Sequence, residues 1–248
     1  MAGFADHFSG VARGYAAFRP RYPAQLFAAL AGVAPANDAV WDCGCGTGQA
    51  STSLAAYFAR VHATDASAQQ IAQAEPHARV AYRVAPAEQS GLPDGSVALV
   101  TVAQALHWFD VDAFHCEARR VLQPGGLIAE WSYTLLDAPT APAVAAVVNA
   151  MDTRLKAWWP PQRMHVDARY EDLAFPFAPL DVGSFEMESE WTAEQLVGYV
   201  ATWSAVTRFR AATGEDPMVE FVRALTEVWG GAARRQIRWP LVLRVGRT

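Results

Sequence analysis

The stretch Val40-Trp41-Asp42-Cys43-Gly44-Cys45-Gly46-Thr47-Gly48 decides the fold of this chain. It ends a short apolar strand and precedes a segment with helical character. Its glycines let the backbone turn sharply and approach a ligand closely, and the first amides of the following helix can donate to a carboxylate or phosphate. Asp65 closes the next strand, at about the 20-residue distance where such folds carry a ribose-binding acid. The stretch therefore predicts a nucleotide-like ligand at the carboxyl ends of parallel strands.

Two classes of cofactor compete for this loop. A dinucleotide fingerprint requires Gly-x-Gly-x-x-Gly, but the chain has Gly44-x-Gly46-x-Gly48 and carries Gln49 where the third glycine belongs. The acid Asp42 would repel a pyrophosphate, whereas it suits the ammonium group of an amino acid. A Walker loop is excluded because no Gly-Lys-Ser/Thr follows. The loop thus favours a zwitterionic cofactor over a doubly phosphorylated one.

Strands and helices alternate on both sides of the glycine loop. Apolar runs predict strands at Ala39–Asp42, Val61–Thr64, Val80–Val84, Val97–Ala103 and Leu127–Trp131, and helical spacing predicts helices at Ala24–Ala31, Gln49–Phe58, Ser67–Ala74 and Val111–Leu122. Short connections between them are typical of a parallel sheet with helices on both faces. The fold class is therefore α/β, doubly wound.

The regular alternation of predicted strands and helices ends after residue 133. Helices are predicted at Ala143–Trp158, from Ala193 to about Val206 with Thr192 as the cap, and at Pro217–Trp229, with strands at Val182–Trp191 and Trp239–Val245. The two late strands are expected to form an antiparallel edge pair. We divide the chain into a lid segment (1–34), a cofactor-binding core (35–135), a helical cap insertion (136–180) and a part that completes the sheet with added helices (181–248).

Composition limits the partners of the protein. Among the 248 residues 52% are hydrophobic and 18% charged, which predicts a large core, and the net charge of −5 argues against nucleic acid. Three cysteines form no disulfide framework, the charged N-terminus does not resemble a signal peptide, and no apolar run spans a membrane. We expect a cytoplasmic protein without membrane contact, either a monomer or a homodimer.

The motif Asp42-x-Gly44-x-Gly46-x-Gly48 resembles the first motif of class I S-adenosylmethionine-dependent methyltransferases. The segments Ala85-Pro86-Ala87-Glu88, Val97–Trp108 and Pro124-Gly125-Gly126 match that family in order and spacing. The resemblance covers roughly residues 35 to 135. It implies a seven-stranded Rossmann-like sheet that is mostly parallel, with an antiparallel edge strand and a helical cap, and methyl transfer from S-adenosylmethionine.

The flanks are similar to a narrower group. Tyr15-x-x-x-Arg19-Pro20-x-Tyr22-Pro23 and Gln104-Ala105-x-His107-Trp108-Phe109-Asp110 resemble the small-molecule subgroup described as UbiE-like or type 11, which includes enzymes similar to trans-aconitate methyltransferases. The resemblance implies an acceptor oxygen in a small molecule, with a carboxylate as the preferred case, and an N-terminal segment that folds over the cofactor.

The candidate site residues follow from these motifs. Residues expected to bind the cofactor are Asp42, Gly44, Cys45, Gly46, Gly48, Asp65, Ala66, Ala87, Glu88, Gln104, Tyr15 and Arg19. His107 follows the fourth strand and is either a catalytic base or a hydrogen-bonded residue that shapes its loop. Aromatic residues expected to line the substrate pocket are Trp108, Trp131, Tyr133, Tyr22 and Trp203.

Three of these features have other interpretations. Cys43 and Cys45 lie inside the glycine loop without a matching Cys/His pair, so no metal is expected. A nicotinamide-dependent oxidoreductase is disfavoured by the glycine spacing and by Asp42. A non-catalytic binding or regulatory protein that keeps the cofactor pocket stays open as an alternative.

Overall fold

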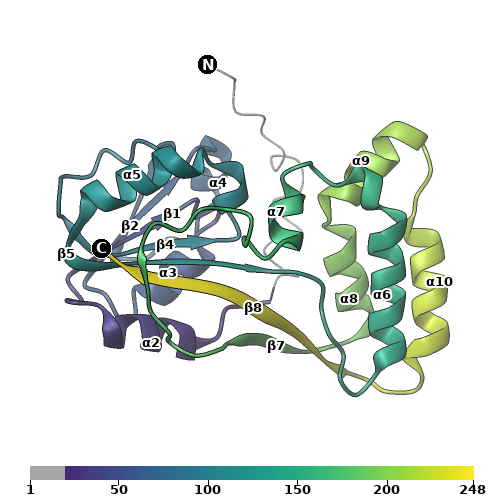
Figure 1. Ribbon diagram of the computed structural model, residues 1–248. Coiled ribbons are helices and arrows are strands. Elements are labelled where there is room, and N and C mark those ends of the chain that lie inside the picture. Colours follow the sequence, from purple (N-terminus) through teal and green to yellow (C-terminus); the bar gives the residue numbers. More distant parts are fainter. Residues whose placement is uncertain (1–19) are drawn as a thin grey trace.

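The computed structural model describes residues 20–248, and its centre is a twisted sheet (Figure 1). The first five strands are β1 (Ala39–Cys43), β2 (Arg60–Asp65), β3 (Val80–Val84), β4 (Val97–Ala103) and β5 (Leu122–Tyr133). They are parallel in the order β3-β2-β1-β4-β5. The strand order reverses at β1, because β2 and β3 lie on one side of it and β4 and β5 on the other. Open α/β sheets bind ligands at such a switch point.

The central strands β1 and β4 are buried on both faces, which explains their largely apolar sequences. Val40 and Leu99 pack against helices α2 (Ala24–Val33) and α3 (Gln49–Leu54), whereas their neighbours Trp41 and Val100 face helix α5 (Val111–Val121). A short helix, α4 (Ala68–Ala72), joins β2 to β3 and has Ser67 as its N-cap. Successive strand residues point to opposite faces, so a strand covered on both sides carries few polar residues.

The late part of the chain completes the sheet. The long strand β8 (Arg235–Arg247) runs antiparallel to β5, and its other edge pairs with β6 (Ala178–Pro179) and β7 (Glu186–Trp191). The predicted fold class is confirmed, as is the antiparallel pairing of the two late strands. β8 itself lies one position in from the edge, and β6 was not predicted because a two-residue strand has no sequence pattern to recognise.

A group of helices forms a cap beside the carboxyl ends of the central strands (Figure 1). It contains α6 (Pro142–Arg154), α8 (Ala193–Ala201), α9 (Ser204–Thr213) and α10 (Met218–Trp229), which share one hydrophobic core. Two helices replace the single predicted helix from Ala193 to about Val206, because the chain leaves helical geometry at Trp203 and buries that indole against Trp159 and Tyr199. The capping box of α8, formed by Thr192 and Gln195, is present as expected.

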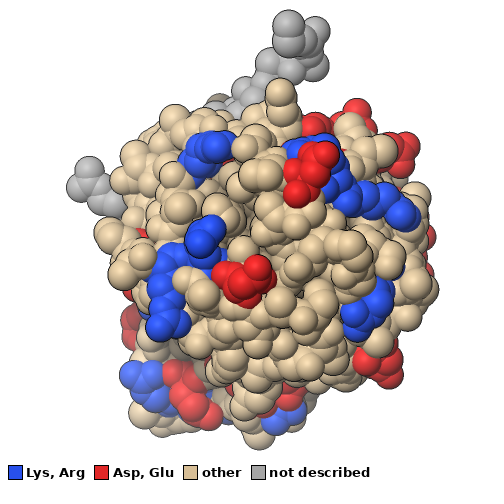
Figure 2. Space-filling model, turned by 90° about the vertical axis from the view of Figure 1, so that its left-hand side faces the viewer, with Lys and Arg blue, Asp and Glu red and all other residues tan. Residues whose placement is uncertain are grey.

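Between β5 and β6 two short elements link the cap to the sheet. They are the 3-10 turn η2 (Lys156–Trp158) and helix α7 (Arg163–Asp167), which packs against the 3-10 turn η1 (Leu106–Trp108) after β4. On the face shown in Figure 2 basic and acidic side chains are interspersed among uncharged ones. In residues 20–248 no helix has the length and hydropathy needed to cross a membrane.

Candidate functional site

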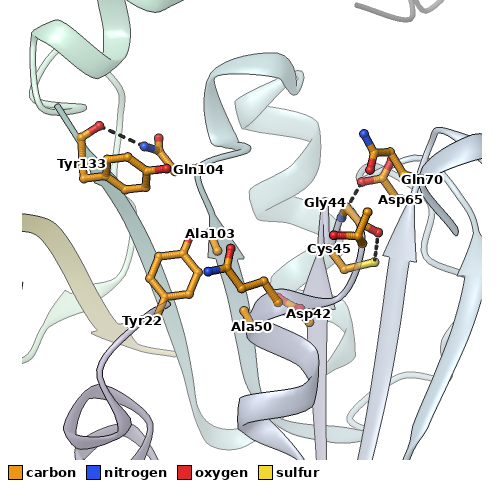
Figure 3. A pocket seen from close by; sticks show the side chains of 13 residues that line it. Tyr22, Asp42, Gly44, Cys45, Ala50, Asp65, Gln70, Ala103, Gln104 and Tyr133 are labelled. Atoms are coloured by element: carbon orange, nitrogen blue, oxygen red, sulfur yellow. Dashed lines mark hydrogen bonds between the residues drawn. The ribbon is translucent and has the colours of Figure 1, made fainter. Parts of the chain in front are cut away.

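A pocket opens where β1, β2 and β4 end (Figure 3). Its walls come from the glycine loop, from the ends of these strands and from aromatic residues beside them. The described residues that line it are Tyr22, Asp42, Gly44, Cys45, Gly46, Thr47, Gln49, Ala50, Asp65, Gln70, Ala103, Gln104 and Tyr133. Parallel strands carry their functional residues at their carboxyl ends, so the site lies where the strand order predicts it.

The glycine loop depends on the absence of side chains. Gly44, Gly46 and Gly48 all have positive φ angles, of 67°, 55° and 88°. A Cβ at Gly44 would lie 2.5 Å from the Cβ of Ala105, and one at Gly48 would overlap the hydroxyl of Tyr82. Of the five residues from Gly44 to Gly48, the first four, Gly44, Cys45, Gly46 and Thr47, line the pocket. At its glycines the loop therefore places backbone, rather than a side chain, against the space for a ligand.

Asp42 is the most unusual acid of the site. Its side chain is fully buried, and its two oxygens accept hydrogen bonds from the hydroxyls of Ser51 (2.5 Å) and Thr101 (2.9 Å). Burial, reinforced by the nearby charge of Asp65, raises the pKa of this carboxyl to about 6 although both hydroxyls lower it. An ionised carboxylate here lacks an adjacent cation among residues 20–248, and the pocket beside it is the place from which a positive ligand group would approach.

Asp65 organises two backbone segments at once. Its Oδ2 accepts a hydrogen bond from the amide of Gly46 (2.9 Å), and its Oδ1 accepts one from the amide of Ser67 (2.8 Å). The first bond fixes the glycine loop, and the second fixes the start of α4. The adjacent Ala66 is exposed, and Gln70 lines the pocket from α4 (Figure 3). Asp65 thus stands at the pocket wall while it shapes the loop.

The segment 85–88, which is predicted to lie beside the adenine of the cofactor, is not among the residues that line the pocket. Ala87 is buried in the core, and the Oε1 of Glu88 accepts a hydrogen bond from the backbone amide of Asp110 (2.9 Å). Asp110 in turn caps α5 through its own side chain. Glu88 therefore ties the end of β3 to the loop that follows β4, and its role toward a cofactor stays a prediction.

Gln104 stands at the other end of the pocket with a strained backbone. Its φ angle is 55°, which is uncommon for a residue other than glycine. Its backbone amide donates to the carbonyl of Trp131 (2.8 Å), and its side-chain amide donates to the carbonyl of Tyr133 (2.9 Å). These two bonds to β5 hold the strained conformation. Figure 3 shows Gln104 beside Tyr22 and Tyr133, and all three line the pocket.

His107 lies on the loop after β4, next to the glycine loop. Its Nδ1 is 3.0 Å from the hydroxyl of Tyr170, and its ring contacts that of Trp108 in a tilted arrangement, with the ring centroids 4.9 Å apart. Burial lowers the pKa of His107 to about 3, with smaller contributions from the nearby His165 and Arg163. The imidazole is therefore neutral at physiological pH and is not part of the described pocket lining.

The predicted aromatic residues have different environments. Tyr22 and Tyr133 line the pocket, whereas Trp131 is fully buried in the core, with ring contacts to Tyr22 and Phe27. Trp131 is therefore not seen to form a pocket wall. Its buried indole packs against the ring of Tyr22, which does line the pocket. Trp203 is buried in the cap core, and Trp108 is half-buried beside His107. Tyr15 and Arg19 lie outside the described residues.

Cysteine chemistry is suppressed at the loop. Burial and the charge of Asp42 raise the pKa of the thiols of Cys43 and Cys45, which disfavours the thiolate needed to bind metal or attack an electrophile. Residues 20–248 contain no cluster of histidine, cysteine and acidic side chains suited to a metal ion.

Sequence reasoning missed the hydroxyls that hold Asp42. Thr101 is the one polar residue within the apolar strand Val97–Ala103, and this interruption was a usable signal. Ser51 lies in α3 nine residues after Asp42, where nothing in the sequence marks it. Thr47, Gln49 and Gln70 also line the pocket without having been predicted.

Known proteins with the same features are methyltransferases. A family model described as a methyltransferase domain, type 11, matches residues 41–129. A protein of Dictyostelium discoideum named as a methyltransferase is 33% identical over 230 residues, which cover 91% of this chain and 87% of that protein. A UbiE ubiquinone/menaquinone biosynthesis C-methyltransferase of Rubrivivax gelatinosus is 37% identical over 94 residues, 37% of this chain and 38% of that protein.

The solved structures agree with the sequence relatives. A protein of Anaeromyxobacter dehalogenans named as a type II methyltransferase is 48% identical and superposes with a TM-score of 0.86 over 93% of this chain and 98% of that chain. The glycine loop, the acids at the ends of β1 and β2, and these relatives lead to one conclusion. The chain belongs to the class I S-adenosylmethionine-dependent methyltransferases, and S-adenosylmethionine is its cofactor.

Proposed function

We propose that this methyltransferase acts on a small molecule and methylates an oxygen atom that arrives ionised, such as a carboxylate. The observation that carries the proposal is the burial of His107, which lowers the pKa of its imidazole to about 3. A general base is most effective when its pKa is near the operating pH, so His107 is poorly suited to remove a proton from an alcohol. An acceptor that is already anionic needs no base. The resemblance to trans-aconitate methyltransferases agrees with this acceptor class.

The residues around the pocket fit the cofactor. We infer that Asp42 binds the ammonium group and that the backbone of Gly44, Cys45, Gly46 and Gly48 lies against the methionine part. Asp65 and Ala66 are assigned to the ribose and Ala87 and Glu88 to the adenine side. The remaining cofactor contacts are assigned to Gln104, Tyr15 and Arg19.

When bound, S-adenosylmethionine supplies an electrophilic methyl group on its sulfonium sulfur. The chain's own part is to orient the two reactants and to exclude water. We assign Tyr22, Tyr133 and Trp108 to the acceptor side, because Tyr22 and Tyr133 line the pocket beside Gln104 and Trp108 adjoins His107. The guanidinium of Arg163 on α7 lies close enough to His107 to contribute to its lowered pKa, and a positive side chain near this loop favours an anionic acceptor.

Base treatment of the product tests the acceptor class. The protein is incubated with a metabolite extract and S-adenosylmethionine that carries a radiolabelled methyl group, and the products are then treated with alkali. A carboxylate acceptor gives a methyl ester, so we expect the label to be released as volatile methanol. Label that resists alkali would indicate an ether, amine or carbon product and would contradict the carboxylate assignment. Cofactor binding without any transfer would favour a non-catalytic role instead.

Cofactor affinity is expected to depend on pH through Asp42. The ammonium binds the ionised carboxylate, which is about one tenth populated at pH 5 if its pKa is about 6. Affinity should therefore rise roughly tenfold between pH 5 and pH 7.5 and then level off. Calorimetric titration with S-adenosylhomocysteine at several pH values measures this, and an affinity that does not change between pH 5 and pH 7.5 would argue against the ammonium contact.

A further inference from the structure

The loop that carries His107 is packed directly on the glycine loop. Gln104 lines the pocket, and Ala105 and Phe109 lie 2.5 Å and 3.0 Å from the position of a Cβ on Gly44. In the sequence His107 lies between these two contact residues, and its side chain is partly exposed. Its Nε2 makes no hydrogen bond with residues 20–248.

The other side of the imidazole is held by a residue far away in the sequence. Tyr170 follows α7, is fully buried, and places its hydroxyl 3.0 Å from the Nδ1 of His107. Both Arg169 and Tyr170 have positive φ angles, of 57° and 60°. Such a backbone is strained for residues other than glycine and persists only where its surroundings impose it.

A buried ion pair imposes this conformation. The Nη1 of Arg244 donates to the carbonyls of Tyr170 (2.7 Å) and Leu173 (2.9 Å), while its Nη2 pairs with the Oε2 of Glu130 (2.7 Å). Glu130 has no exposed surface, and its Oε1 is 2.6 Å from the Nε2 of His115. The strained turn at Tyr170 is thus anchored to β5, β8 and α5, which are fixed parts of the sheet and its covering helix.

The direction of the hydrogen bond follows from the surroundings of the phenol. Burial raises the pKa of Tyr170 well above its usual value, so the hydroxyl keeps its proton and can donate it. The Ser132 hydroxyl lowers the pKa of Tyr170, as a hydrogen-bond donor to the phenol oxygen does, so it does not compete for the phenol proton. The Nδ1 of His107 is then the acceptor, and in a neutral imidazole the single proton must sit on Nε2.

We propose that Tyr170 is a positioning residue that holds His107 with its proton on Nε2, so that His107 offers the methyl acceptor a hydrogen-bond donor and not a base. This rests on the proposed function, in which the acceptor oxygen arrives ionised. A donor at Nε2 can orient an oxygen anion through one lone pair while another attacks the methyl carbon. The same donor disfavours amines that arrive as ammonium ions, since two donors would face each other.

The tautomer of His107 tests the proposal without any variant of Tyr170. Protein with ¹⁵N-labelled histidine gives ring signals for its six histidines, and the His107 signals are those missing from His107→Gln. In long-range ¹H–¹⁵N spectra of the native protein we expect a protonated Nε2 and a Nδ1 that accepts a hydrogen bond. A protonated Nδ1 would overturn the proposal. The measurement needs neither cofactor nor acceptor, so its result is independent of whether the proposed reaction is correct.

Tyr170→Phe tests the consequence for catalysis. The variant keeps the ring and removes the hydroxyl, so the His107 signals should lose the hydrogen-bonded Nδ1 character. We expect kcat to fall about 3- to 10-fold with unchanged affinity for S-adenosylhomocysteine, as for the loss of one orienting hydrogen bond. Tyr57→Phe, which removes a hydroxyl that donates to a backbone carbonyl elsewhere, should leave both readouts unchanged. Native kcat and an unchanged His107 spectrum in Tyr170→Phe would contradict the proposal.

Discussion

Replacing Asp42 with asparagine is expected to weaken S-adenosylhomocysteine binding roughly 10- to 100-fold, the usual worth of a charge-assisted hydrogen bond. Asparagine has the same shape and can still bond to the hydroxyls of Ser51 and Thr101, so the pocket should keep its form. What disappears is the negative charge that we assign to the cofactor's ammonium group. Calorimetric titration measures the loss, and an affinity equal to that of the native protein would contradict the assignment.

The same variant should be more stable than the native protein in the absence of cofactor. Folding raises the pKa of Asp42 from 3.8 to about 6, so the folded state loses stability as pH rises through this interval, up to about 3 kcal/mol above pH 6. Asp42→Asn removes that cost, and its advantage in the free energy of unfolding should grow from pH 4 to pH 6 and then stay constant. Asp38→Asn, at an exposed position, serves as the control and should show no such trend.

Replacing Asp65 with alanine is expected to reduce both cofactor affinity and stability. The amides of Gly46 and Ser67 lose their acceptor, which should cost on the order of 1–3 kcal/mol for each donor that stays buried. The glycine loop would lose its anchor to β2, and the ribose would lose its assigned partner. We therefore expect affinity for S-adenosylhomocysteine to fall more than about 100-fold, with a lower midpoint of thermal unfolding.

Asp181→Ala is a matched control for this variant. Asp181 also accepts a hydrogen bond from the amide two residues later, that of Gly183 (2.8 Å), but in an exposed irregular segment that does not line the pocket. Its loss should change stability slightly and leave affinity for S-adenosylhomocysteine unchanged. If Asp65→Ala bound as tightly as this control, neither the loop anchor nor the ribose contact would hold.

The parts of the fold that depend on local pattern could be predicted from the sequence. The runs Val80–Val84 and Val97–Ala103 are strands with those bounds, and the glycine loop follows β1 as expected. Buried parallel strands and their connecting helices carry strong periodic signals. The break between α8 and α9 could not be predicted, because no proline or glycine marks Trp203. It is the tertiary packing of that indole that ends the helix.

The residues of the candidate site also fall into those that local sequence pattern predicts and those that depend on tertiary packing. Asp42, Asp65 and the loop glycines could be placed because a strand, a tight turn and a helix fix their positions within a few residues. Trp131 was interpreted as a pocket wall, yet the pleat of β5 turns its indole into the core. The partnership of His107 with Tyr170 joins residues 63 apart and depends on a strained backbone and a distant ion pair. No sequence motif around His107 or around Tyr170 predicts such a contact.

The most direct test of the account combines a change in the protein with a change in the ligand. S-adenosylhomocysteine and an analogue whose α-amino group is replaced by hydrogen are titrated into the native protein and into Asp42→Asn. If Asp42 binds the ammonium group, removal of the amino group should weaken binding strongly in the native protein and little in the variant, giving a coupling energy of about 1.5–3 kcal/mol. Equal losses in the two proteins would show that Asp42 and the amino group act independently, and would contradict the role assigned to the Asp42–Gly48 loop.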